Sequence, residues 1–291
     1  MIRLIALDID GTLVDTGWQV PEANRLAIAS ARALGVEVVL VTGRRFDFTR
    51  AIVDQLEGPL TLIVNNGALV KTRDGVTLAA TLLPSEVARA VLETTREYRS
   101  QAAVVFDRAG QGQVVHEPVE APDPAMQRYF DRNREFVRET TPLEDALIED
   151  PIQIMFAGPL LEMRRLEGLL RSAAFEGRCS VAVTEYEQRN LSLVDVIRHG
   201  CSKGAALAAW ARRQGIEQEA VMAVGDNLND REMLEFAGVP VVMGNSVPAL
   251  KSAGWNVTLS NDEAGVAAAI EQFVLATPGG TRASRAFHGG A

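Results

Sequence analysis

The chain has 291 residues, 47% of them hydrophobic and 23% charged, and its formal net charge is −9 at pH 7. That length allows one large domain or two ordinary ones, and the acidic balance argues against nucleic acid or an anionic membrane as a partner. No apolar run approaches the roughly 18 residues of a membrane span, and the first apolar run stops at Asp8, too early for a signal peptide. We expect a cytoplasmic protein, and a monomer or homodimer.

Residues 1–83 alternate strand and helix signals. The expected elements are a strand ending at Leu7, a helix from Pro21 to Gly35, a strand at 36–41, a helix at 46–56, a strand from 61 that ends at Asn65-Asn66-Gly67, and a hairpin around Asp74-Gly75. Unbroken apolar strands separated by helices are typical of a parallel sheet that is covered on both faces.

The pattern changes after residue 83. We expect a helix at 85–98, strands at 102–106 and 152–157, a helix at 160–171, and strands near 180–184 and 191–196, with a polar, Pro-rich stretch at 117–124. The first pattern resumes with a helix at 203–213 and strands at 220–224 and 239–243. We interpret this as an α/β, doubly wound core (1–83 and 191–275) with an inserted α+β cap (84–190), followed by a flexible tail (276–291).

Polar residues follow several of the expected core strands. Asp8, Thr42 and Asp226 each stand at the carboxyl end of an apolar run. In doubly wound sheets these ends meet in one crevice, where ligands bind. A plain turn at Asp10-Gly11 is the alternative, but independent turns would not need a charged or hydroxyl residue at every strand end.

Four carboxylates would converge in that crevice: Asp8, Asp10, Asp226 and Asp230. Two unit charges 4 Å apart repel by about 4 kcal/mol at an effective dielectric near 20. A divalent cation removes this repulsion, and hard oxygen ligands without His or Cys favour Mg²⁺ over zinc. A phosphate would bridge to the metal, with Thr42, Lys203 and backbone amides near Asp10 and Gly43 as donors.

Four motifs stand in order along the chain: "DIDGT", "TGR", "SKG" and "GDNLND". They resemble the four motifs of the haloacid dehalogenase superfamily of phosphotransferases, and most closely its Cof-type sugar phosphatases, in which a subclass IIB cap precedes the Lys motif. The resemblance covers nearly all of residues 1–272. It implies a cytoplasmic, Mg²⁺-dependent phosphatase of a small phosphorylated sugar or polyol.

The resemblance also implies roles for residues of the first and last motifs. Asp8 would be the nucleophile that forms an aspartyl-phosphate, and Asp10 would protonate the leaving oxygen and then activate water. Asp8, Asp226 and the backbone carbonyl of Asp10 would hold Mg²⁺. Asp230 would support the metal or Lys203, and Asn229 would touch substrate.

For the two middle motifs, the resemblance implies that Thr42 and Gly43 bind the phosphoryl group and that Lys203 neutralises it.

Other interpretations of the sequence stay open. A phosphomannomutase-like phosphotransferase shares both aspartates of the first motif, and a catalytically silent binding protein could keep the same scaffold. Arg45 is either a surface charge or part of the site, Asn66 either a turn residue or a ligand contact, and the basic stretch around Arg132 either a solvated helix face or a substrate clamp.

Overall fold

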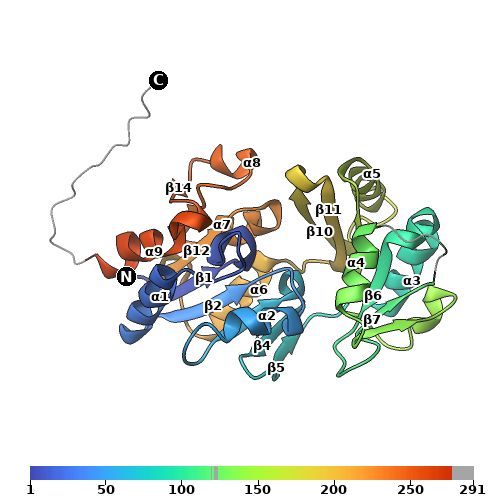
Figure 1. Cartoon of the computed structure of the whole chain (residues 1–291), viewed down its shortest axis with the longest axis horizontal. Coiled ribbons are helices and arrows are strands. Elements are labelled where there is room, and N and C mark those ends of the chain that lie inside the picture. Colours follow the sequence, from blue (N-terminus) through green and yellow to red (C-terminus); the bar gives the residue numbers. More distant parts are fainter. Residues whose placement is uncertain (119, 121–123, 277–291) are drawn as a thin grey trace.

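The computed structural model describes residues 1–118, 120 and 124–276 (Figure 1). The tail expected at 276–291 lies outside the described residues, except for Ala276. Figure 1 shows two bodies side by side, one built around an eight-stranded sheet and the other around a six-stranded sheet. No helix in the described part of the chain combines the length and hydrophobicity that crossing a bilayer requires.

The larger sheet has six adjacent parallel strands and a two-stranded antiparallel edge. In spatial order its strands are β14 (Asn256–Val257), β13 (Val239–Val242), β12 (Val221–Gly225), β1 (Leu4–Leu7), β2 (Glu37–Val41), β3 (Thr61–Val64), β4 (Leu69–Thr72) and β5 (Thr77–Ala80). β4 and β5 form the hairpin predicted around Asp74-Gly75.

Alternate residues of the parallel strands point to opposite faces of this sheet, and helices cover both. Ile5 and Leu7 belong to the core formed with α1 (Glu22–Ala33), α2 (Phe46–Val53) and α9 (Gly265–Ile270). Leu4 and Ala6 belong to the core formed with α6 (Lys203–Arg213), α7 (Arg231–Phe236) and α8 (Pro248–Lys251). Because both faces are buried, the central strands β1, β12 and β13 carry no polar side chain, and the predicted doubly wound core is confirmed.

The second sheet is built from residues between β5 and α6. In spatial order its strands are β10 (Cys179–Tyr186), β11 (Leu191–Arg198), β9 (Gln153–Gly158), β6 (Ala102–Val105), β7 (Val114–His116) and β8 (Val137–Glu139). Every residue of β11 pairs with β10, and its centre also pairs with β9. The core boundary expected at residue 191 is therefore wrong, because β11 is an interior strand of the second sheet. The strands of both sheets are largely apolar, so hydrophobicity does not show where the chain passes from the second sheet back to the core. The chain turns back toward the core after Arg198, at Gly200, whose φ is +77°.

Helices also cover the second sheet. α3 (Ser85–Thr94) and α5 (Leu160–Leu170) pack on one face with Val104, Phe156 and Val194. α4 (Pro124–Arg132) packs against β9 on the other face, where Met126 and Phe130 are buried. β7, α4 and β8 were not among the expected elements. β7 and β8 have three residues each, too few for an alternating pattern to mark them, and α4 begins in the Pro-rich stretch, which indicates a loop.

Candidate active site

The carboxyl ends of three neighbouring core strands carry the polar residues that the sequence singled out. β12, β1 and β2 are adjacent, and Asp226, Asp8 and Thr42 are the residues that follow them. The backbone N–H of Asp8 donates to the Val224 carbonyl at 3.0 Å. Sheet pairing thus continues to Asp8, which fixes where its carboxylate leaves the sheet.

Gly11 allows Asp226 to approach the loop after β1. This glycine has φ +74°, and a Cβ at its position would overlap the Asp226 carboxylate. Any side chain at residue 11 would therefore be strained and would push Asp226 away from Asp8. The glycine of the first motif is required by a close approach as well as by a turn.

Lys203 enters the site as the first residue of α6. Ser202 caps this helix, and its hydroxyl accepts a hydrogen bond from the Ala205 N–H at 3.0 Å. The Lys203 ammonium donates to Asp8 Oδ1 at 2.6 Å and to Asp230 Oδ1 at 2.7 Å, and its side chain is 1% exposed. A buried ammonium of this kind is stabilised because two carboxylates share it.

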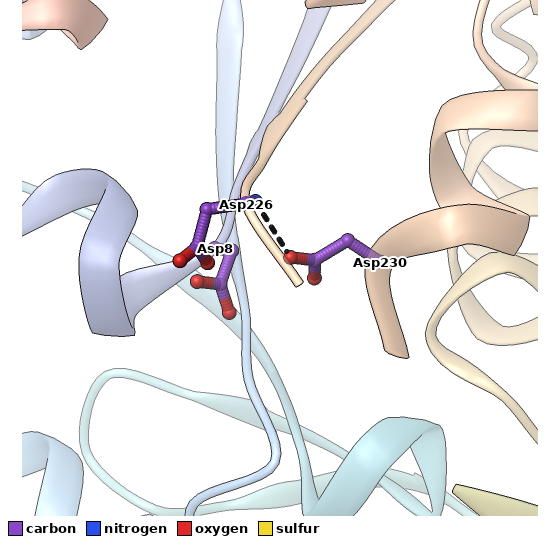
Figure 2. A group of neighbouring side chains, drawn as sticks. All are labelled: Asp8, Asp226 and Asp230. Carbon is purple, nitrogen blue, oxygen red and sulfur yellow. Dashed lines mark hydrogen bonds between the residues drawn. The ribbon is translucent and has the colours of Figure 1, made fainter. Parts of the chain in front are cut away.

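Asp230 is held by donors on both of its oxygens. While Oδ1 accepts from Lys203, Oδ2 accepts from the N–H groups of Asp226 at 2.9 Å and Asn227 at 3.0 Å. Figure 2 shows Asp230 facing Asp8 and Asp226, with the bond to the Asp226 backbone dashed. Asp230 therefore ties the loop after β12 to Lys203.

Burial sets the protonation of this cluster. Burial raises the pKa of Asp8 to about 7, the charge on Asp230 adds to the rise, and the Lys203 ammonium opposes it. Burial and the charge on Asp8 likewise raise the pKa of Asp226 well above its usual value. Burial disfavours the charged form of Lys203, but the carboxylates of Asp230 and Asp8 outweigh this and raise its pKa. Without a cation the cluster retains a proton near neutral pH.

The same carboxylates suit a hard divalent cation. Asp8, Asp226 and Asp230 each offer an oxygen, and these oxygens all lie within 4.8 Å of one another. Asp226 Oδ1 is buried and accepts no hydrogen bond from a described residue. An unpartnered buried carboxylate oxygen in an all-oxygen cluster fits Mg²⁺. Since Asp230 is already occupied by three donors, Asp8 and Asp226 are the better ligands.

Asp10 lies outside this carboxylate cluster. Its two oxygens accept hydrogen bonds from Arg44 Nε and Nη2, both at 2.7 Å. The Arg44 guanidinium in turn lies over the Trp18 ring, 4.5 Å from its centre. Arg44, which the sequence placed only in the "TGR" motif, thus holds the side chain that was assigned the acid and base role.

Thr42 and Gly43 present unused donors beside Asp8. The Thr42 hydroxyl oxygen accepts the Arg44 N–H at 3.1 Å, so its own proton is free to be donated. The Gly43 N–H makes no hydrogen bond to any residue among 1–118, 120 and 124–276. With the Lys203 ammonium, these groups could surround a phosphoryl group.

A buried amide network joins this site to the second sheet. The Asn66 Nδ2 donates to Asp195 Oδ2 at 2.7 Å, and Asn66 Oδ1 accepts from Asn229 Nδ2 at 3.0 Å. Gln153 donates to Asp195 Oδ1 at 2.7 Å and accepts from Asn65 Nδ2 at 3.2 Å. Asn66 is therefore more than a turn residue, although its φ is +52°.

A cavity of about 310 Å³ lies between the two bodies, over the cluster. Its core side includes Asp8, Asp10, Gly43, Lys203, Asp226 and Asn229. Arg45, which sequence left open, is buried at its edge: Nη2 donates to Gln113 at 2.8 Å, and Phe48 and Phe136 lie 5.0 and 4.9 Å from its guanidinium. Arg132 also lines this cavity.

Over residues 5–270 the sequence matches the family model of haloacid dehalogenase-like hydrolases. The chain belongs to this family. It is 31% identical over 252 residues to the HMP-PP phosphatase of Serratia proteamaculans (strain 568), with 87% of each chain covered. It is 28% identical over 275 residues to the 5-amino-6-(5-phospho-D-ribitylamino)uracil phosphatase YcsE of Bacillus subtilis (strain 168), covering 94% of this chain and 96% of that one.

The solved structures agree. A haloacid dehalogenase-like hydrolase from B. subtilis superimposes with a TM-score of 0.76 at 26% identity, covering 94% of this chain and 100% of that one. The family, the fold class and the enzyme class predicted from the sequence, a phosphatase of the haloacid dehalogenase superfamily, are confirmed.

Proposed function

We propose that the protein is a Mg²⁺-dependent phosphomonoesterase that works through a phosphorylated Asp8. One observation carries this proposal: the buried Asp8 carboxylate lines the cavity, hydrogen-bonded to Lys203 and adjacent to the unpartnered oxygen of Asp226. A carboxylate that faces a cavity beside a candidate metal ligand suits a nucleophile better than a structural ion pair.

The reaction would take two displacements at phosphorus. An Asp8 oxygen attacks the phosphoryl group, the O–P bond to Asp8 forms, and the bond to the leaving oxygen breaks. Asp10 donates a proton to that oxygen, and the alcohol departs. Asp10 then accepts a proton from a water molecule, which attacks the same phosphorus and releases inorganic phosphate from Asp8. To act in this way, Asp10 must give up part of its paired bond to Arg44.

The remaining groups would neutralise negative charge and position the phosphoryl group. Asp8, Asp226 and the Asp10 backbone carbonyl would hold Mg²⁺, which when bound offsets the negative charge of carboxylates and phosphate. Lys203, the Thr42 hydroxyl and the Gly43 N–H would donate to the phosphoryl oxygens.

The relatives act on small phosphorylated substrates according to their names, and these names do not agree on one substrate. For this chain we propose a small phosphorylated metabolite. The sugar or polyol class, the cytoplasmic location, the absence of nucleic-acid or membrane partners, and the monomeric or homodimeric state stay predictions. A phosphomannomutase-like transfer is the alternative activity.

Phosphate release tests the proposal directly. The wild type and Asp8→Asn are compared with Mg²⁺, and with chelator, on a panel of sugar, polyol, nucleotide and glycerate phosphates. We expect release that requires Mg²⁺ and falls by at least about 10⁴-fold in Asp8→Asn, because the nucleophile is lost. Mg²⁺-dependent phosphate exchange with a hexose bisphosphate, without net release, would instead establish the mutase.

A further inference from the structure

One face of the second sheet forms the wall of the active-site cavity opposite the carboxylates. On β11, Leu191, Leu193 and Asp195 line the cavity, whereas Val194 and Val196 pack under the helices on the other face. The same alternation of period two places Thr184 and Tyr186 of β10 at the wall. In Figure 1 the β10–β11 hairpin is the part of the second sheet that lies nearest the core.

Aromatic side chains line this cavity from both bodies. The cavity is lined by Trp18, Phe48, Tyr129 and Tyr186, which include two of the three tyrosines of a chain that is only 5% aromatic. Tyr129 and Phe48 meet edge to face, with ring centres 5.9 Å apart. Burial and the charges of Asp10, Asp8 and Asp226 raise the pKa of Tyr186, which is consistent with a position close to the reacting groups.

Trp18 faces the same cavity from the core. Its side chain is 48% exposed, and its φ of +64° is one that a bulky residue rarely adopts. This half-exposed indole lies over the Arg44 guanidinium and belongs to none of the hydrophobic cores, so core packing does not explain its left-handed conformation. It is well placed to contact a ligand.

Aliphatic side chains fill much of the rest of the wall: Val105, Met155, Leu191 and Leu193. Arg132, Arg189 and Thr184 also line the cavity, and no side-chain hydrogen bond joins them to a described residue. Two other polar groups are already paired. Asp195 accepts from Asn66 and Gln153, and Gln153 accepts from Asn65. Most of the exposed surface of the cavity is nonetheless apolar.

We infer that the alcohol part of the substrate carries a flat aromatic or heteroaromatic ring, joined to the phosphate by a short arm and stacked within the Trp18–Tyr186 wall. This inference rests on the proposed phosphatase activity and departs from the sugar or polyol expected from the sequence. Flat rings gain from aromatic walls both by burial and by ring geometry. A cavity of about 310 Å³ holds one ring and its phosphate arm.

Three probe esters separate ring shape from hydrophobicity. Benzyl phosphate and cyclohexylmethyl phosphate differ in having a flat or a puckered ring of the same size, and glucose 6-phosphate has a puckered ring rich in hydroxyls. With Mg²⁺ present, we expect kcat/KM for benzyl phosphate to exceed the other two by at least about 10-fold. Equal or better turnover of either puckered ester would overturn the inference and leave the phosphatase standing.

Substitutions test which residues cause the preference for the ester with a flat ring. Trp18→Leu and Tyr186→Leu should each lower the benzyl to cyclohexylmethyl ratio of kcat/KM by about 3- to 10-fold. Tyr98→Leu, which removes the third tyrosine from a site under α3, should leave the ratio unchanged. A ratio that is the same in all three variants and the wild type would contradict the assigned wall.

A binding measurement keeps the two proposals apart. Quenching of Trp18 fluorescence, taken as the difference between wild type and Trp18→Leu, is followed with each ester without Mg²⁺. If no ester releases phosphate but benzyl phosphate binds at least about 10-fold more tightly than cyclohexylmethyl phosphate, the phosphatase fails and the ring site stands. Binding without that preference overturns the ring site.

Discussion

The two sides of the active-site cavity are built in opposite ways. On the core side, charged groups are buried and joined by short hydrogen bonds, such as the 2.6 Å contact of Lys203 with Asp8. On the side of the second sheet, aliphatic side chains, two tyrosines and two arginines line the cavity, and the carboxylate there, Asp195, meets amides instead of cations. Two sheets with different strand patterns supply these two sides.

This difference separates the residues that would carry out the reaction from those that would select the substrate. Charges that converge at strand ends provide electrostatic stabilisation, which depends on a few tenths of an ångström. An apolar wall provides binding by area and shape, and tolerates changes of similar volume. We therefore expect substitutions on the core side to affect every substrate, and substitutions on the wall to affect some substrates only.

The largest effect after loss of Asp8 should come from Lys203→Arg. Arg keeps the charge, but its planar guanidinium cannot occupy the place of an ammonium that lies 2.6 Å from Asp8 and 2.7 Å from Asp230 with 1% exposure. We expect kcat/KM to fall by about 10³-fold for every substrate. Phosphate release, with thermal unfolding to verify folding, measures this.

Lys71→Arg is the matched control. Lys71 is also buried and donates to a carboxylate, Asp107 Oδ1, at 2.8 Å, but it lies outside the active-site cavity. This variant should keep its activity within about 3-fold, because an ion pair at this site affects stability alone. Equal losses in both variants, or full activity in Lys203→Arg, would remove the role assigned to Lys203.

Gly11→Ala should have an intermediate effect, directed at the metal. The new methyl group overlaps the Asp226 carboxylate, so we expect the Mg²⁺ concentration needed for half-maximal activity to rise by about 10-fold. Gly215→Ala is the control: its φ is +63°, and a Cβ there meets nothing within 4 Å. Both variants should lose about 1 to 2 kcal/mol of stability from left-handed strain. A normal Mg²⁺ requirement in Gly11→Ala would contradict the place given to Asp226.

The core side of the site could be predicted from the sequence for a physical reason. Parallel strands bring their carboxyl ends together, so Asp8, Thr42 and Asp226 had to meet once the strands were recognised. The structure brings Asp8 and Asp226 together, with Lys203 and Asp230 in contact, and places Thr42 at the end of the adjacent strand β2. Their catalytic roles stay predictions.

The wall could not be predicted in the same way. β7, α4 and β8 are short, and which face of β10 and β11 meets the cavity depends on a packing of two sheets that no local pattern records. The bond between Arg44 and Asp10 joins residues 34 apart, and Arg residues are common in this chain. Asp195 appeared to be one more strand residue, because its amide partners come from distant segments.

Asp195→Asn should have the smallest effect, and it sharpens the contrast because Asp195 is the carboxylate that the described part of the second sheet contributes to the cavity. Burial raises the pKa of Asp195 to about 7, while the Asn66 hydrogen bond opposes the rise. Its facing groups, Gln153 and Tyr129, carry no charge near neutral pH. The folded state then binds a proton that the unfolded state has lost above its usual pKa of 3.8. Stability from this group is present at low pH and is lost as pH rises toward 7, by up to about 1.4 kcal/mol per unit.

The difference in the free energy of unfolding between wild type and Asp195→Asn isolates the pH-dependent contribution of Asp195 to stability. From pH 5 to pH 7, we expect the wild type to lose stability relative to the variant by about 1 to 2 kcal/mol, and the difference to level off above about pH 7. Asp107→Asn, at a carboxylate 35% exposed beside Lys71, gives the baseline. Chemical denaturation at several pH values measures all three proteins. A difference that does not change with pH would mean that Asp195 stays ionised, and that the wall, like the core side, holds a buried charge.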